Sequence, residues 1–364
     1  AGQHQAHLGL SLRVISEEAE VSSLAREWNE LCLECPESDL FQSAEYVLNW
    51  WMVFARDHDL RVYAVRDRAA KLLGLLPAFL IRRRKFTQGD YYELRFLGSH
   101  GGLQGGYFDL LARPRDRTRV TGMIVPAMLG EGAVWRTANL KGVPTDSPFA
   151  RRLMRDLGVS ESSFSRVKHE IIELPPSFPL YLNTLGPDTQ KLVQVACEKA
   201  GFDARTKIEV HTEKQDVAAW VERYIKLGLG RPNSVLTSQD GTFVKRLCAD
   251  LIRSDRVSAV SCVVDRKHAS VLLTYRWGGT TYVDSIRTTR DKPNLDEHLA
   301  LCGEAIRHVI KHGASRCDFL ASNSVSKMLA PQSRETIDVL VSRSGGESPG
   351  FGRRLKSLLK RQRK

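Results

Sequence analysis

The chain has 364 residues, of which 42% are hydrophobic and 26% charged, so it is long enough to bury the cores of two medium-sized domains. No apolar run approaches the about 20 residues that cross a bilayer, and residues 1–7 lack the basic start and apolar stretch of a secretory signal. The net charge is +12, with basic runs at 82–85 and in a tail at 346–364, which suits anionic partners.

Hydrophobic periodicity predicts a mixed order of helices and strands in the first half. Ser43 is a plausible N-cap, and Tyr46, Trp50 and Val53 share one face of the helix that follows, so they should line a core. A glycine-rich turn is predicted at 98–106. We expect helices over 20–35, 43–57 and 115–128, and strands over 60–65, 72–82, 91–97, 107–111 and 133–140.

The middle of the chain contains the strongest linker signal. Three prolines fall within five residues at 175–179, and proline breaks helices and central strands. We therefore expect an N-terminal domain over 8–173, a linker over 174–180, a C-terminal domain over 181–345 and the basic tail over 346–364.

The second half repeats the order of the first, which indicates a tandem duplication of one α/β unit. Helices are predicted over 216–227, 242–252 and 296–313, and strands over 257–265, 269–277, 280–286 and 317–320.

Cysteine and histidine patterns give no clear metal site. The seven cysteines are scattered and odd in number, which favours reduced thiols and a cytoplasmic location. Glu304, His308 and His312 share one helix face, but without a fourth ligand we interpret them as a surface stripe and predict no metal. Ser99 and His100 are hydrolase residue types, yet as sequence neighbours their side chains should diverge.

Three segments together carry a family pattern. The run 41–54 places Trp50 beside Trp51 on an amphipathic helix, and Gly-Leu-Leu-Pro-Ala-Phe at 74–79 and Leu-Arg-Phe-Leu-Gly-Ser at 94–99 follow it. This series resembles the CelD-like acyltransferases, a branch of the GNAT acetyltransferase superfamily linked to cellulose and exopolysaccharide synthesis. The resemblance implies two tandem GNAT-like α/β domains, each a mixed, mostly antiparallel sheet flanked by helices, as in Fem-type transferases.

The resemblance also implies a site in the second half. GNAT enzymes move an acyl group from a CoA thioester to an amine, so acyl-CoA, with acetyl-CoA foremost, is the implied co-substrate. Its phosphates would lie at the start of the helix from Leu295, although the loop before it lacks the family's glycines and Asp296 adds a negative charge. The implied cofactor-binding residues are Ser285, Arg287, Arg290, Lys292 and Asn294, and the catalytic candidates are Asp284, Asp318 and Lys327.

Three functions stay open. The first is an N-acyltransferase acting on an amino sugar, a sugar nucleotide or a related small amine in envelope or exopolysaccharide synthesis. The second is a divergent GNAT-fold scaffold, and the third a Fem-like transferase that uses aminoacyl-tRNA. The basic tail could bring the protein to the inner membrane surface or to polysaccharide-synthesis proteins.

Overall fold

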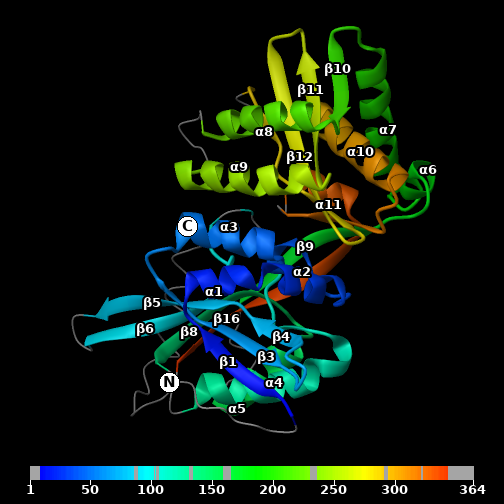
Figure 1. Cartoon of the computed structure of the whole chain (residues 1–364). Helices are drawn as coiled ribbons and strands as arrows, with labels where there is room; N and C mark the ends of the chain where they lie inside the picture. The colour runs from blue at the N-terminus through cyan, green and yellow to red at the C-terminus, as the bar shows by residue number, and fades with distance from the viewer. Residues whose placement is uncertain are drawn as a thin grey trace.

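The computed structural model describes residues 9–85, 89–101, 103, 106–130, 134–158, 165–229, 236–290, 294–320 and 323–342. The expected basic tail at 346–364 and Lys292 therefore lie outside the described residues. Figure 1 shows two parts, with the first half of the chain below and most of the second half above. Within the described residues, no helix is long and apolar enough to cross a membrane.

Helices and strands alternate through both halves. The first half forms β1 (Ser11–Ile15), α1 (Glu18–Ser23), α2 (Ala25–Leu33), η1 (Leu40–Gln42), α3 (Ala44–Phe54), β2 (Asp59–Leu60), β3 (Val62–Arg66), β4 (Leu72–Leu76), β5 (Ala78–Lys85), β6 (Gly89–Phe96), β7 (Leu111–Ala112), α4 (Pro114–Leu129), β8 (Trp135–Pro144), α5 (Pro148–Leu157) and β9 (Ser165–Glu173). The second half forms α6 (Phe178–Leu182), α7 (Pro187–Phe202), β10 (Thr206–His211), α8 (Lys214–Leu229), α9 (Ser238–Arg253), β11 (Val257–Val264), β12 (His268–Trp277), β13 (Thr280–Val283), β14 (Arg287–Thr288), α10 (Leu295–Lys311), β15 (Arg316–Phe319), α11 (Ser324–Leu329) and β16 (Gln332–Ser342).

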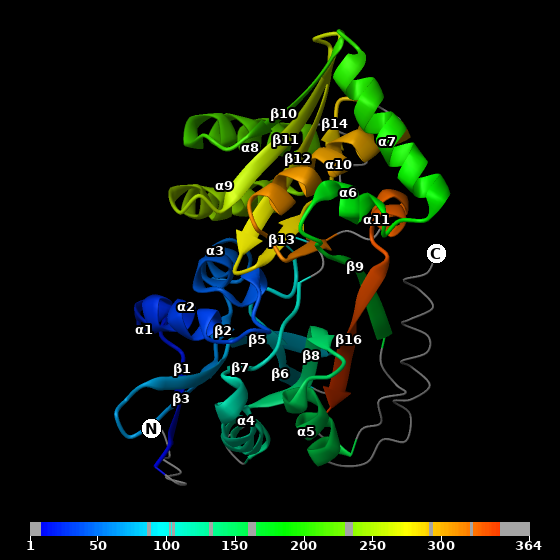
Figure 2. The ribbon, with the colours of Figure 1, turned by 90° about the vertical axis from the view of Figure 1, so that its right-hand side faces the viewer.

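The described strands form one large mixed sheet and one small sheet. The small sheet has the order β1-β3-β4-β7. The 12-stranded sheet runs β10-β11-β12-β13-β15-β9-β16-β8-β6-β5-β2, with β14 paired to β12. Figure 2 shows β10–β12 between α8 and α9 on one side and α7 and α10 on the other. This arrangement confirms the expected mixed α/β fold with a sheet flanked by helices.

Strands β9 and β16 join the two halves into one sheet. β16 pairs antiparallel with β9 and also with β8 of the first half, while β9 pairs antiparallel with β15 of the second half. Figure 2 shows both strands running between the upper and lower parts. Residues 174–177 belong to no helix or strand, and α6 begins at Phe178. The first part of the predicted linker thus contains no helix or strand, whereas the large sheet continues from one half to the other.

One predicted strand is divided in two. The stretch 72–82 forms β4 and β5, which belong to different sheets. Pro77 lies between them and has no N–H to continue a ladder, while its carbonyl accepts a hydrogen bond from Leu97 N at 3.1 Å. The chain therefore changes sheets at this proline.

Helix α3 lies in the core between the halves. Its N-cap is Ser43, whose side chain accepts from Tyr46 N, as predicted. Trp50 is 1% exposed, and the Tyr46 ring meets Phe243 of α9 edge-on at 5.1 Å. Side chains of α3 and α9 belong to one hydrophobic cluster, so the halves are packed together through an apolar interface.

Among the described strands of the second half, β13 and β15 form a parallel pair. Residues 280–283 of β13 pair with 316–319 of β15, and α10 makes the connection. Groups at the carboxyl ends of parallel strands commonly form ligand sites. Asp284 follows directly after β13, so the fold places it at such an end.

Candidate active site

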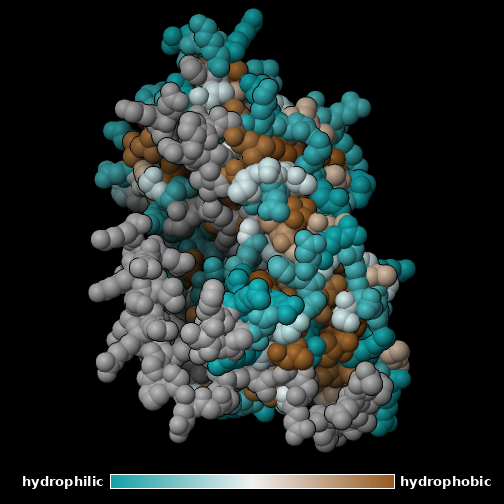
Figure 3. All heavy atoms as spheres, turned by 90° about the vertical axis from the view of Figure 1, so that its left-hand side faces the viewer, coloured by the Kyte–Doolittle hydropathy of each residue, from teal (hydrophilic) through white to brown (hydrophobic). Residues whose placement is uncertain are grey.

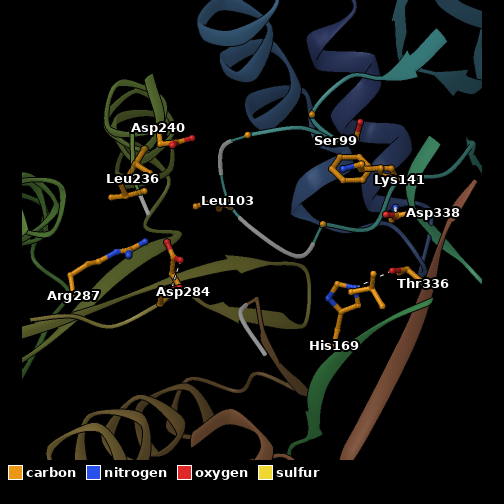
Figure 4. Close-up of a pocket in the computed structure, with 18 of the residues that line it drawn as sticks. Ser99, Leu103, Lys141, His169, Leu236, Asp240, Asp284, Arg287, Thr336 and Asp338 are labelled. Atoms are coloured by element: carbon orange, nitrogen blue, oxygen red, sulfur yellow. Dashed lines mark hydrogen bonds between the residues drawn. The ribbon is translucent and has the colours of Figure 1, made fainter. Parts of the chain in front are cut away.

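A cavity of about 380 Å³ lies between the two halves. Figure 3 shows the molecular surface hollowed at mid-height, and Figure 4 shows the side chains around the cavity. A volume of this size suits a small metabolite. Its polar lining includes Ser99, Lys141, His169, Tyr224, Asp240, Asp284, Ser285, Arg287, Thr336 and Asp338.

Asp284 is a fixed carboxylate on the cavity wall. Its Oδ2 accepts from the hydroxyl of Tyr275 at 3.0 Å, and its Oδ1 accepts from Ser285 N at 2.7 Å. Its own N–H donates to Leu273 O at 3.0 Å, which holds the chain where β13 ends. Because β12 and β14 are paired, the chain turns back after Asp284 and brings Ser285 and Arg287 to the same wall.

Arg287 places a guanidinium group beside Asp284. Its Cζ lies 5.4 Å from the centre of the Tyr224 ring, and its Nε is buried without a hydrogen-bond partner among the described residues. Burial alone would lower the pKa of Arg287, but Tyr224 and Asp284 raise that pKa above its ordinary value. Arg287 is therefore a permanent cation that can donate hydrogen bonds to a ligand oxygen.

At the start of α10, the described residues of the predicted phosphate site already have partners within the protein. Asn294 caps the helix by accepting from Glu297 N at 3.2 Å, and Arg290 pairs with Glu297 at 2.9 Å. Lys199 pairs with Asp296 at 3.1 Å. Neither Arg290 nor Asn294 lines the cavity. Arg290 is thus engaged by a carboxylate seven residues later, and its contact with a phosphate stays a prediction.

The other two predicted catalytic residues lie outside the cavity lining. Asp318 on β15 is 2% exposed and accepts from the Tyr107 hydroxyl at 2.8 Å. Burial raises the pKa of Asp318 to about 7, although the Tyr107 hydrogen bond and the Arg334 charge act against this rise. Lys327 is exposed on α11. The structure thus brings neither residue to the wall that carries Asp284.

His169 is a cavity residue that sequence reasoning missed. It lies on β9, and its Nε2 is 3.1 Å from Thr336 Oγ1 of β16. Burial, followed by the Arg334 charge, lowers the pKa of His169 to about 4, so the ring is neutral near pH 7. The partial alternation of polar and apolar residues over 165–173 could have indicated a strand. It could not have placed His169 in a cavity, because the strand's sheet partners are distant in sequence.

The expectation that the Ser99 and His100 side chains diverge is wrong. The two side chains do not diverge, because Ser99 Oγ lies 2.8 Å from His100 Nδ1. Ser99 Oγ also donates to Phe96 O at 2.9 Å. The glycine-rich turn does border the cavity, through Gly98, Gly101, Leu103 and Gly106.

The histidines of the α10 stripe contact each other. The rings of His308 and His312 have centroids 4.1 Å apart. In the described part of the chain, no three His, Cys, Asp or Glu side chains gather in a way that could hold a metal ion.

Comparison with known proteins shows a family match within the second half of the chain. Residues 196–328 match the model of the acetyltransferase (GNAT) domain. This segment contains β11–β15 and α10, so the cavity wall with Asp284 and Arg287 lies within the part of the chain that matches the GNAT acetyltransferase domain. No curated protein sequence matches the chain.

Two solved structures show the same fold over nearly the whole chain. A crystal structure of FemX has a TM-score of 0.59 at 11% identity, with 92% of this chain and 98% of that chain covered. The C-terminal domain of a putative lysylphosphatidylglycerol synthetase from Agrobacterium fabrum has a TM-score of 0.55 at 11% identity, with 95% and 97% covered. The likeness is one of fold.

Proposed function

We propose that the protein is an acyl-CoA-dependent N-acyltransferase whose acceptor amine binds in the cavity between the halves. The observation that carries this proposal is the pair of Asp284 and Arg287 on the cavity wall, within the segment that matches the GNAT domain. A carboxylate and a guanidinium side by side can serve a reaction that removes a proton and develops negative charge on oxygen.

The residues of this wall have distinct roles in such a reaction. Asp284 takes a proton from the acceptor amine, whose nitrogen then forms a bond to the acyl carbon. Arg287 donates hydrogen bonds to the carbonyl oxygen as it becomes negative. The C–S bond of the thioester breaks, and the thiolate that leaves takes a proton from solvent. Tyr275 and the Ser285 N–H keep the Asp284 carboxylate in place throughout.

The acceptor that we propose is an amino sugar, a sugar nucleotide or a related small amine in envelope or exopolysaccharide synthesis. The support for this class is the CelD-like pattern at 41–54, 74–79 and 94–99. The cavity lining adds support, because hydroxyl, imidazole and carboxylate groups from both halves face it. Such groups can hydrogen-bond to the hydroxyls of a sugar.

A second donor is favoured by one observation. The first turn of α10 carries Asp296 and Glu297, and the Asn294 side chain already occupies Glu297 N. A helix start with two carboxylates is a poor site for the pyrophosphate of CoA. An aminoacyl-tRNA donor, as in Fem-type transferases, would bring its acyl ester to Asp284 without a phosphate at this helix. If neither donor reacts, the scaffold function is the one that stands.

The test is a transfer assay with both donors. Purified protein is given acetyl-CoA or charged tRNA with a panel of amino sugars and sugar nucleotides, and product is followed by mass spectrometry. We expect acetyl transfer in the wild type and a loss of about 100-fold or more in kcat for Asp284→Asn, since a base contributes 10²–10⁴-fold. The control is Asp188→Asn, an exposed first-turn aspartate of α7. Transfer that survives Asp284→Asn unchanged would contradict the assignment.

A further inference from the structure

Lys141 lines the cavity but has no part in the proposed acyl-transfer reaction. It lies on β8, is half-buried, and makes no ion pair with any residue in the described ranges. Figure 4 shows Lys141 on the opposite side of the cavity from Asp284 and Arg287. The cavity therefore has an acyl-transfer end in the second half and a basic end in the first.

Two arginines act electrostatically on His100, the neighbour of the cavity residue Ser99, although neither arginine lines the cavity. Arg83 and Arg95 share one carboxylate, Glu93, at 3.1 and 2.5 Å. The pKa of His100 is lowered to about 3, first by burial and then by the positive charges of Arg95, Lys141 and Arg83. The ring is therefore neutral near pH 7. Of these three cations, Lys141 is the one that lines the cavity.

Asp338 is the second carboxylate of this region. It lines the cavity from β16, and its Oδ1 accepts from Gly142 N at 3.0 Å. Lys141 and Asp338 are not within ion-pair distance of each other. A ligand anion in the cavity could form a charge-assisted hydrogen bond with the Lys141 ammonium, which no carboxylate in the described ranges pairs with.

We propose that the basic end binds an anionic group of the acceptor, so that the acceptor is an amine that also carries a phosphate ester or a carboxylate. This inference rests on the proposed transfer reaction and names its substrate class. The amine lies toward Asp284 and the anion toward Lys141, which orients the acceptor along the cavity. Arg287 remains available to the donor carbonyl, because a separate cation neutralises the acceptor.

Matched acceptors test this proposal. Glucosamine and glucosamine 6-phosphate differ by one phosphate, and ethanolamine and phosphoethanolamine form a second pair. Lysine and cadaverine form a third pair, which differs by a carboxylate. Binding of each is measured by calorimetry without a donor, and KM is measured with acetyl-CoA. We expect the wild type to prefer the anionic member of at least one pair. Lys141→Gln should weaken binding of that member roughly 10-fold to 100-fold and leave binding of the partner that lacks the anion unaffected.

Three controls make the result specific. Lys141→Arg keeps the charge and should preserve most of the preference. Lys168→Gln removes an exposed β9 lysine that pairs with Glu335, and should leave binding unchanged. The effect of Lys141→Gln should shrink as salt rises. A wild type without preference for any anionic member, or a preference that survives Lys141→Gln, overturns the proposal.

The binding readout separates this inference from the transfer reaction. If no acetyl product forms but the anionic amine binds through Lys141, the anion site stands and the proposed donor chemistry fails. If product forms without any preference for an anionic acceptor, the transfer reaction stands and the anion site fails.

Discussion

The Tyr107 hydroxyl donates a hydrogen bond of 2.8 Å to Asp318 Oδ2 and so connects the two halves of the chain. Tyr107 precedes β7 in the first half, whereas Asp318 lies on β15. The guanidinium of Arg334, on β16, lies 4.4 Å from the centre of the Tyr107 ring. Asp318 thus belongs to the joint between the halves, which explains why a residue at a promising strand position is absent from the cavity lining.

Asp318→Asn should change the pH dependence of stability. The folded-state pKa of about 7 lies above the ordinary 3.8, so the unfolded chain loses this proton first as pH rises. The contribution of the protonated Asp318 carboxyl to the free energy of unfolding is greatest below about pH 4, and it decreases as the pH rises to about 7. The free energy of unfolding of the wild type relative to Asp318→Asn should therefore fall by roughly 2–3 kcal/mol between pH 5 and 8.

Urea unfolding at pH 5, 6, 7 and 8 measures this difference. Buried Asp109, whose pKa burial raises to about 6, is present in both proteins and cancels in the comparison. A difference that stays constant over this range would show that Asp318 does not titrate there.

Arg290→Ala should reduce stability. Glu297 is buried and accepts from Ser270 and Arg290, so removal of the guanidinium leaves one of its oxygens without its partner. We expect a loss of roughly 1–3 kcal/mol in the free energy of unfolding. Arg26→Ala, which breaks an exposed i,i+4 pair with Glu30, is the matched control and should cost about 0.3–0.5 kcal/mol. Equal effects of the two substitutions would refute the structural role of Arg290.

Trp50→Ala should be among the most damaging substitutions in α3. The Trp50 ring packs against Phe54 and Phe79, and its Nε1 donates to His100 O at 2.7 Å. We expect a loss of about 3–5 kcal/mol in the free energy of unfolding. Trp220→Ala, on the partly exposed face of α8, should cost less. An unchanged melting temperature for Trp50→Ala would show that the core assignment is wrong.

Gly142→Ala should strain the cavity wall. Gly142 has φ +67°, and an added Cβ would lie 2.4 Å from Gly106 O. A non-glycine residue in this conformation costs roughly 1–2 kcal/mol before the clash is counted. Gly122→Ala, in an open position on α4, should instead stabilise by up to about 1 kcal/mol. The two thermal unfolding curves should therefore shift in opposite directions, and a common direction would be evidence against this backbone geometry.

Local patterns predicted the elements whose signal lies within one segment. Apolar residues at helical spacing marked α8 and α9, and alternation or apolar runs marked β11 and β12, because burial of one face leaves a periodic trace. β9 and β16 were not predicted. Their partners lie up to about 205 residues away, as in the register of 342 with 137, and no short window contains that information.

The candidate site was predictable in part for the same reason. Asp284, Ser285 and Arg287 follow one strand, so their common wall could be inferred from the family order of elements. The sequence does not show that Arg290 pairs with Glu297, because this ion pair depends on how the loop folds onto α10. Lys141 and His169 reach the cavity only because β8, β16 and β9 are neighbours in the sheet.

Calorimetric titration of acetyl-CoA tests the central claim most directly. The account predicts measurable binding to the wild type, and binding at least about 10-fold weaker to Arg287→Ala, since a hydrogen bond to a charged group contributes about 1.5–3 kcal/mol. Arg290→Ala should bind as the wild type does, because Glu297 holds that side chain away from the ligand. No binding of acetyl-CoA to the wild type, or equal affinity in the wild type and Arg287→Ala, would contradict the account.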